Sequence, residues 1–323
     1  MNKALIVGVN GQDGSYMADL LLSKGYEVIG WVPNSVPVSY KNIKDILDKI
    51  EIVQGDLYNQ EALMNLLQTY QPDEIYNLAS PSSPSASWKD VVNVSEVTAL
   101  GVARLLEAVR LKCPDARFYQ ASSSELFGNP VEAPQNENTP FHPRNPYGIA
   151  KLYAHWITVN YREKHNLFAV SGIMYNHESP RRDFHFVTRK ITHGAAQIKL
   201  GESDELKLGN LKARRDWGFA GDYVEAMWLM LQQDSPNDFV VGSGETHSVK
   251  EFCEIAFKFL GLDYKNHVRT VPEYYRPIEK KQLVADIHKI RSELGWEPKY
   301  KFVNLIQLMV EKDMALILDS SQK

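Results

Sequence analysis

The sequence predicts an α/β protein built around a doubly wound parallel sheet. Three features of its first 120 residues predict this fold: short apolar runs recur, amphipathic segments separate them, and glycines follow the first run. Continuous apolar strands that alternate with helices are typical of a parallel sheet covered on both faces. Crossovers between such strands are right-handed almost without exception, so a doubly wound sheet is the expected arrangement.

The expected elements follow one another through short connections. Strands are predicted at residues 4–7, 28–32, 50–53, 74–78 and 117–120. Helices are predicted at residues 15–24, 61–70, 94–110 and 148–165. The first helix illustrates the pattern, because Met17, Leu20 and Leu21 fall on one of its faces.

The pattern changes after residue 174. Helices are predicted there at 187–198, 222–231, 249–260 and 302–318, with one further strand at 239–241. We expect residues 1–174 to form the sheet domain, to which the chain returns around 212–245. Residues 175–323 are expected to form a smaller, mostly helical substrate-binding lobe. The two parts should enclose a cleft at the carboxyl edge of the sheet, where doubly wound folds bind ligands.

Composition narrows the classes of function. Hydrophobic residues make up 44% of the 323, and the net charge of −4 creates no field that favours nucleic acid or an anionic membrane. The two cysteines lack metal-ligand spacing, which indicates a reducing cytoplasm and argues against a zinc site or a disulfide framework. No apolar stretch approaches the roughly 20 residues that cross a bilayer. We therefore expect a cytoplasmic protein that binds no metal, membrane or nucleic acid.

A glycine-rich turn follows the first strand and opens the first helix. Glycines let the backbone approach a pyrophosphate, while the helix N-terminus supplies N–H donors. The turn therefore predicts a Rossmann-type site for a nicotinamide dinucleotide, and its GxxGxxG spacing favours the short-chain dehydrogenase variety; the alternative is a plain tight turn. The predicted cofactor ligands are Gly8, Asn10, Gly11, Gln12, Asp13 and Gly14.

Three further segments are expected to contact the cofactor. Asp56 and Leu57 follow the third strand, where Asp56 would accept from the adenine amino group; alternatively, Asp56 caps the next helix. The segment after the fourth strand, Leu78, Ala79 and Ser80, would pass beneath the ribose. Asn34 follows the second strand, where an acid would favour NAD and an arginine NADP. The cofactor is thus NAD or NADP.

Tyr147 and Lys151 form the predicted oxidising pair. They lie four residues apart, on one face of a helix. A neighbouring ammonium favours phenolate, so Lys151 is expected to lower the pKa of Tyr147 from about 10. The phenolate would take the proton of a sugar hydroxyl while hydride leaves for the nicotinamide. The alternative, an exposed tyrosine and lysine without chemistry, fits less well because a serine cluster precedes the pair.

That cluster follows the strand at 117–120 and leads into an acid. Ser123 can align the reacting hydroxyl, and Ser124 lies beside it. Glu125 is more informative, because oxidation and return of hydride need no carboxylate. Once C4 of a hexose is a ketone, the C5 proton is acidic, and a carboxylate can remove it while water leaves C6. The alternative for Glu125 is a turn residue bonded to backbone.

Long motifs resemble one family, the GDP-mannose 4,6-dehydratases, which are extended short-chain dehydrogenases. The similar stretches are GQDGSY (11–16), FYQAS (118–122), NHESPRR (176–182), FVTRKI (186–191), RDWG (215–218), DYVEAMW (222–228) and YYRP (274–277). The resemblance implies a nucleoside-diphosphate-sugar 4,6-dehydratase whose cofactor is tightly bound and recycled. It implies that Glu125 is the base, that Tyr147 and Lys151 oxidise, and that Ser123 replaces the family's threonine.

The resemblance also implies a substrate pocket. Arg215 and Arg276 would make bidentate contacts to a diphosphate, although taken alone each arginine fits a surface or interface position. The implied lining residues are Ser82, Ser83, Ser124, Asn176, Val187, Lys190, Gly209, Arg215, Arg276 and Glu279.

Three departures from the family pattern bear on specificity and assembly. Pro33 and Asn34 replace paired arginines, which weakens the case for NADP. The loop at 35–50 is shorter than usual, so a homodimer through the helices at 94–110 and 148–165 is expected, with a tetramer possible. Residues 80–85 replace a segment with a glutamine and a histidine, so the substrate is GDP-mannose or a relative such as GDP-N-acetylglucosamine or a GDP-heptose. Alternatives are a 4-epimerase, a 4-reductase or a C4 dehydrogenase, and more remotely a cofactor-sensing binding module.

Overall fold

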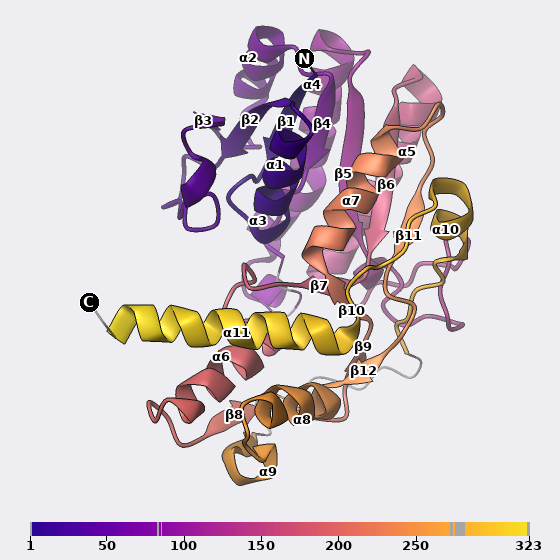
Figure 1. The fold of residues 1–323 in the computed structure, drawn as a ribbon. Helices are drawn as coiled ribbons and strands as arrows, with labels where there is room; N and C mark the ends of the chain where they lie inside the picture. The colour runs from indigo at the N-terminus through magenta and orange to yellow at the C-terminus, as the bar shows by residue number, and fades with distance from the viewer. Residues whose placement is uncertain (1, 83, 85, 272–273, 275–281, 322–323) are drawn as a thin grey trace.

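A seven-stranded parallel sheet forms the centre of the computed structural model, which describes residues 2–82, 84, 86–271, 274 and 282–321. The strand order is β11-β6-β5-β4-β1-β2-β3 (Figure 1). The strands are β1 (Lys3–Val7), β2 (Glu27–Val32), β3 (Glu51–Gln54), β4 (Glu74–Asn77), β5 (Arg117–Ser123), β6 (Ala169–Met174) and β11 (Phe239–Val241). The order reverses between β1 and β4, so a ligand crevice is expected at the carboxyl ends of these strands.

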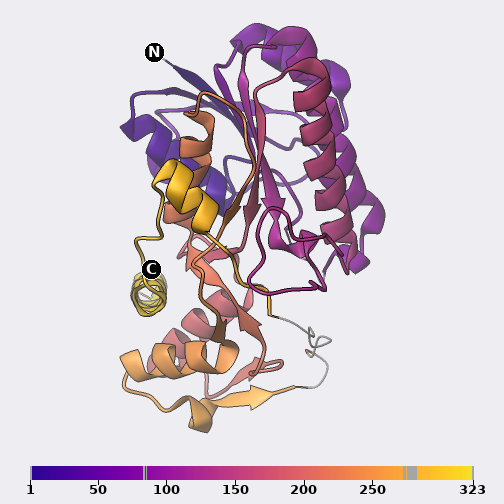
Figure 2. The same ribbon diagram turned by 90° about the vertical axis from the view of Figure 1, so that its right-hand side faces the viewer.

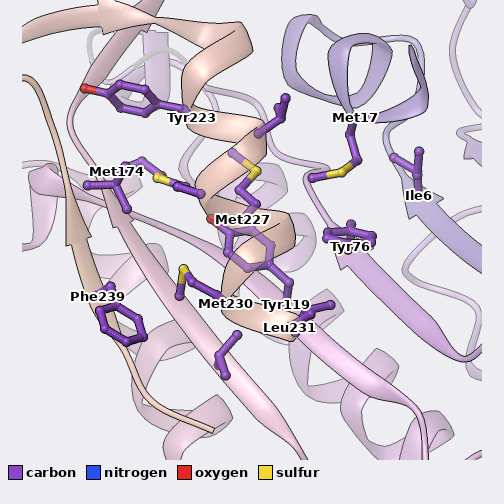
Figure 3. Packing of buried hydrophobic residues seen from close by; sticks show 14 of the residues in the cluster. Ile6, Met17, Tyr76, Tyr119, Met174, Tyr223, Met227, Met230, Leu231 and Phe239 are labelled. Atoms are coloured by element: carbon purple, nitrogen blue, oxygen red, sulfur yellow. The ribbon is translucent and has the colours of Figure 1, made fainter. Parts of the chain in front are cut away.

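Helices cover both faces of the sheet, as Figure 2 shows. On one face lie α1 (Gln12–Ser23) and α7 (Ala220–Leu231), whose Met17, Met227 and Met230 pack over sheet residues that include Tyr76 and Tyr119 (Figure 3). The other face is covered by α2 (Gln60–Tyr70), α4 (Gly101–Lys112) and α5 (Pro146–His165). The predicted doubly wound α/β fold is confirmed.

A second core lies below the sheet's carboxyl edge. It joins α6 (Val187–Lys199), α8 (Val249–Phe259) and α11 (Phe302–Ser321). The buried Arg189 of α6 and Asp313 of α11 form an ion pair of 2.6 Å that ties two of these helices. Around them lie α9 (Tyr264–His267) and short strand pairs: β7 (Asn176–Glu178) with β10 (Trp217–Phe219), β9 (Arg214–Arg215) with β12 (His247–Ser248), and β8 (Leu206–Leu208) with β13 (Val268–Thr270). The helix α10 (His288–Leu294) instead packs beside β11, where its Ile290 joins the core of the sheet.

The helix predicted at 94–110 is not one regular helix. It consists of α3 (Val91–Ser95), a π-helical turn η3 (Glu96–Leu100) and α4. Thr98 lies in this turn, and its hydroxyl is 2.9 Å from the Ser80 hydroxyl beyond β4. π-Helical turns are rare and occur frequently at functional sites. Short 3-10 turns occur at η1 (Lys44–Ile46), η2 (Ala86–Trp88) and η4 (Ser124–Leu126).

The later part of the chain contributes to the sheet as well. β11 pairs with β6, with Phe239 opposite Gly172. β6 itself ends at Met174, while the division into two domains stays a prediction. Among the described helices, none combines the length and the apolar character that a bilayer span needs.

Candidate active site

The glycine-rich turn has the shape of a phosphate cradle. Gly8 has φ +90°, and its N–H donates to the Trp31 carbonyl at 2.9 Å. A Cβ on Gly14 would lie 2.2 Å from the Gly8 carbonyl oxygen, and one on Gly8 would lie 3.1 Å from the Ala79 backbone. Gly11 then caps α1, whose first N–H groups face the turn. These features fit a dinucleotide pyrophosphate.

The other predicted cofactor residues surround this turn. Leu78 donates its N–H to Val7 at 3.0 Å, which places Leu78, Ala79 and Ser80 beside the turn. The Asp56 carboxylate accepts from Ser35 at 2.9 Å. Asn59, not Asp56, caps α2 by accepting from the Ala62 N–H, so the capping alternative for Asp56 is wrong. Leu57 is buried, and Asn34 is the second residue after β2.

Tyr147 and Lys151 lie on the buried face of α5, next to the end of β5. Lys151 is 3% exposed, and its ammonium donates to the Ala121 carbonyl at 2.7 Å. The same ammonium lies 5.6 Å from the centre of the Tyr147 ring. Burial lowers the pKa of Lys151 to about 8, and the charge of Asp13 opposes the change. The alternative of an exposed pair is therefore wrong.

The expected lowering of the Tyr147 pKa is also wrong. Burial raises the pKa of Tyr147 above its ordinary value, while a hydrogen bond with Ser123 opposes this rise. The physical reason is that Tyr147 is 8% exposed, whereas the nearby ammonium is directed at the Ala121 carbonyl. The phenol is thus the stable form of this side chain in the structure.

A hydrogen bond that the sequence does not predict holds the Glu125 side chain at the start of α5. Asn145 caps α5 by accepting from the Gly148 N–H at 2.8 Å, and its amide donates to Glu125 Oε2 at 2.7 Å. The Glu125 N–H donates to Ser123 Oγ at 3.2 Å. The Glu125 side chain therefore bonds to a capping side chain, and the backbone-bonded alternative does not describe it. One asparagine both starts the helix of Tyr147 and orients the carboxylate.

The predicted substrate residues are dispersed over several elements of both the sheet and the second core. Lys190 of α6 lies 5.6 Å from the Tyr274 ring, and a Cβ on Gly209 would be 2.5 Å from the Tyr274 carbonyl oxygen, so these two residues share a neighbour. The remaining described residues lie in other places: Asn176 on β7, Val187 at the start of α6, Arg215 on β9, the buried Ser124 on η4 and the exposed Ser82 after β4. Ser83, Arg276 and Glu279 lie outside the described residues.

Hydrogen bonds that the sequence does not predict connect the glycine-rich turn to β7 and the residues after it. The Asp13 carboxylate is 2.9 Å from His177 Nε2, and Gln12 donates to the His177 carbonyl at 3.1 Å. Ser179 Oγ donates to Gln12 Oε1 at 2.8 Å. Burial opposes ionisation of Asp13, but His177 outweighs it and holds the pKa of Asp13 at about 2. Although burial again opposes it, Asp13 raises the pKa of His177.

Comparison with known proteins places the chain in a family. Residues 5–309 match the family model described as GDP-mannose 4,6 dehydratase. The chain belongs to this family. GDP-mannose 4,6 dehydratase 1 of Arabidopsis thaliana is 47% identical over 97% of this chain and 90% of its own length. The Homo sapiens GDP-mannose 4,6 dehydratase is 46% identical over 98% of this chain and 92% of its own length. The resemblance seen in the motifs is confirmed.

Solved structures of other nucleotide-sugar enzymes share the fold of this GDP-mannose 4,6-dehydratase family member. The Thermotoga maritima UDP-glucose 4-epimerase with UDP-glucose has a TM-score of 0.87 at 22% identity, covering 98% of this chain and 99% of its own. The Bacillus anthracis dTDP-glucose 4,6-dehydratase with NAD has a TM-score of 0.85 at 22% identity, covering 97% and 96%. Because both an epimerase and a dehydratase match, the fold alone does not separate the two reactions.

The contribution of the Asp13–His177 ion pair to the stability of the protein can be measured. His177→Gln should lower the free energy of unfolding by about 1–3 kcal/mol at pH 6, since a partly buried carboxylate loses its charged partner. The pKa of His177 is raised in the folded protein, so the ion pair stabilises the fold fully below the ordinary pKa of histidine. This stabilisation is lost as the pH rises through the pKa of folded His177. The difference from wild type should therefore shrink by pH 9 in urea unfolding.

The matched control is Asp19→Asn, which breaks the more exposed Arg181–Asp19 pair of the same helix. It should cost less than about 1 kcal/mol at every pH. A His177→Gln deficit that stays constant from pH 6 to pH 9 would show that the ion pair contributes nothing beyond packing.

Proposed function

We propose that this chain is a GDP-hexose 4,6-dehydratase, which converts GDP-mannose or a close relative into a GDP-4-keto-6-deoxy sugar. One observation carries the proposal: the Glu125 carboxylate is held by Asn145 at the start of the helix that carries Tyr147 and Lys151. Relatives named GDP-mannose 4,6 dehydratases, 47% and 46% identical over nearly the full chain, support it. An oxidising pair alone would equally suit a 4-epimerase, a 4-reductase or a C4 dehydrogenase.

The residues around the glycine-rich turn would hold NAD or NADP. A bound nicotinamide supplies the acceptor for hydride from C4 and the donor that returns it to C6. Gly8, Gly11 and Gly14 shape the turn for the pyrophosphate, and the first N–H groups of α1 donate to it. Tight retention of the dinucleotide follows from a reaction in which the cofactor ends each cycle in its starting redox state.

Oxidation at C4 begins with removal of a hydroxyl proton. Ser123 aligns this hydroxyl, and Tyr147, whose side chain already bonds to Ser123, receives the proton. Because burial raises the pKa of Tyr147, its phenolate needs positive charge nearby. The Lys151 ammonium, 5.6 Å from the centre of the Tyr147 ring, would provide that charge, and an oxidised nicotinamide, when bound, would add to it.

Elimination then uses Glu125. The C4 ketone makes the C5 proton acidic, and the carboxylate removes it while the C6 hydroxyl leaves as water, taking a proton from the acid so formed. With a nicotinamide bound, hydride would return to C6 while Tyr147 gives its proton to C5, which restores the phenolate. Asn145 fixes the carboxylate through Oε2 without neutralising it. A carboxylate in this place is needed for elimination and for no step of simple C4 oxidation.

The second core would bind the nucleotide. Arg215 supplies a guanidinium for the diphosphate, and Arg276 is proposed for the same task from the family pattern. We propose that Asn176, Val187, Lys190, Gly209 and Glu279 line the guanosine side, and that Ser82, Ser83 and Ser124 border the hexose. Small serines at 82 and 83 leave the C2 substituent open, so GDP-N-acetylglucosamine stays a candidate beside GDP-mannose. Both cysteines are buried and free, which fits the reducing cytoplasm we propose.

The reaction has a direct test in deuterium oxide. Incubation with GDP-mannose should yield a product lighter by one water, with one solvent deuterium at C5, and without net formation of NADH or NADPH. Glu125→Gln should retain binding of the GDP-sugar but lose elimination by on the order of 10²- to 10⁴-fold. Mass spectrometry and nicotinamide absorbance provide both measurements.

The matched control is Glu132→Gln, which removes another acid of the same segment that bonds to Thr139 instead. Its turnover should stay near wild type. Reduced nicotinamide that accumulates as substrate is consumed would identify a dehydrogenase. A product that has the mass of the substrate and keeps its C6 hydroxyl would identify an epimerase. Unchanged elimination in Glu125→Gln would remove Glu125 from the mechanism.

We further propose a homodimer built on the face formed by α5, α3 and η3. Ile149, Tyr153 and Trp156 of α5 are exposed at intervals that place them on one side of the helix. Val92 of α3 and Leu100 of η3 are exposed as well, and both elements pack against α5. Such a contiguous apolar face is typical of a subunit interface.

Light scattering after size exclusion tests the dimer. Wild type should have about twice the chain mass of 36.8 kDa. Trp156→Glu should shift it to one chain mass, because a charge at the centre of an apolar interface loses its hydration. Leu318→Glu, at an exposed position on α11, is the control and should leave the dimer intact. A monomeric wild type would contradict the proposal, whereas a mass of four chains would indicate a tetramer.

A further inference from the structure

The end of β2 lies beside the glycine-rich turn, where the adenosine ribose of a dinucleotide is read in this fold. The Gly8 N–H donates to the Trp31 carbonyl at 2.9 Å, and the Gly55 N–H donates to the Val32 carbonyl at 3.0 Å. The residues that follow Val32 therefore leave the sheet between the turn and the loop of Asp56. Their chemistry determines which ribose substituent fits.

Those residues are neutral. Pro33 has no N–H to donate, Asn34 offers a carboxamide, and Ser35 donates its hydroxyl to Asp56 at 2.9 Å. With its proton engaged there, the Ser35 oxygen keeps lone pairs that accept a hydrogen bond. The charged group in the contact between Ser35 and Asp56 is the Asp56 carboxylate, which is an anion.

The loop at 33–42 also directs its one lysine away from the β2 end. It folds back onto the turn, where Asn10 donates to the Ser39 carbonyl at 3.4 Å and Asn42 donates to the Asn10 carbonyl at 3.2 Å. Lys41 instead lies 3.8 Å from Asp183 and 5.6 Å from the Phe184 ring, in the segment that leads to α6. The sequence has no arginine before Arg104, so no guanidinium comes from the first three strands.

We infer that this chain takes NAD rather than NADP, with Asn34 and Ser35 reading the 2′-hydroxyl of the adenosine ribose. The inference rests on the proposed function only in assuming a nicotinamide dinucleotide. A 2′-phosphate carries close to two negative charges and is recognised by guanidinium or ammonium groups. A 2′-hydroxyl needs only a donor and an acceptor, which a carboxamide and a hydroxyl oxygen provide.

The first experiment identifies the dinucleotide. The protein is purified without added cofactor and denatured, and the supernatant is analysed by mass spectrometry; NAD or NADH is expected, and predominant NADP or NADPH would overturn the inference. The emptied protein is then titrated with NADH and with NADPH while nicotinamide fluorescence is followed. NADH should bind more tightly by on the order of tenfold, the worth of about one charge-assisted contact. Equal or tighter binding of NADPH would overturn the inference as well.

A pair of variants tests the assignment to the β2 end. Asn34→Arg places a guanidinium beside the ribose and should shift the NADH to NADPH preference toward NADPH by on the order of tenfold or more. Val36→Arg adds the same charge two residues away, at an exposed position of the same loop, and should leave the preference near wild type. An unchanged preference in Asn34→Arg, or an equal shift in both variants, would overturn the role of Asn34.

These measurements are independent of turnover. If the chain bound NAD but formed no 4-keto-6-deoxy sugar, the proposed reaction would fail while the cofactor inference stood. If the chain dehydrated GDP-mannose with NADP, the cofactor inference would fail while the proposed reaction stood.

Discussion

The hydrogen bond from the Lys151 ammonium to the Ala121 carbonyl is the contact on which the rest of the site depends. It joins a nearly buried cation on α5 to the end of β5, the strand that continues into Ser123 and Glu125. Burying an ammonium is costly unless oxygen atoms solvate it, so the register between helix and strand is strongly constrained. Asn145 adds a second constraint at the start of the same helix, because it caps α5 and also holds Glu125.

This arrangement brings Glu125 of η4 to the start of the helix that carries Tyr147 and Lys151. In the proposed reaction, Tyr147 and Lys151 act where C4 of the sugar loses its hydroxyl proton and a hydride, and Glu125 acts where C5 loses its proton. The charge of Asp13 acts on both Tyr147 and Lys151, so the glycine-rich turn belongs to the same electrostatic environment. Through His177 the turn is also connected to β7, which carries Asn176. The glycine-rich turn and β7 are thereby fixed relative to each other.

Much of the fold and of the candidate site could be predicted from the sequence, because the sequence patterns that indicate them are local. Glycine spacing, apolar runs and the four-residue interval between Tyr147 and Lys151 each report one element or one helix face. The parallel sheet, its covering helices and the family membership followed from them. The long helix at 94–110 was predicted without its π-helical turn, since that turn involves a contact between Thr98 and Ser80 from a distant segment.

Other features of the site and of the fold could not be predicted, because they depend on contacts between residues that are far apart in the chain. Asp13 and His177 are separated by more than 160 residues, and no periodicity connects them. The raised pKa of Tyr147 follows from burial that a helical spacing does not reveal. The short strands β7 to β10, β12 and β13 contain two or three residues each, too few for an alternating pattern. Asn145 was visible only as part of a proline-flanked turn, and its capping role could have been inferred from its place before the helix.

In the proposed reaction, one hydride leaves C4 and returns to C6 of the same sugar within one turnover. GDP-mannose deuterated at C4 tests this most directly, with product analysed by NMR. We expect deuterium at C6 of the 4-keto-6-deoxy product. We expect no transfer of deuterium to a second GDP-mannose that has hydrogen at C4 and a separate mass label elsewhere. Deuterium found in a released dinucleotide, returned to C4, or exchanged between substrate molecules would contradict it.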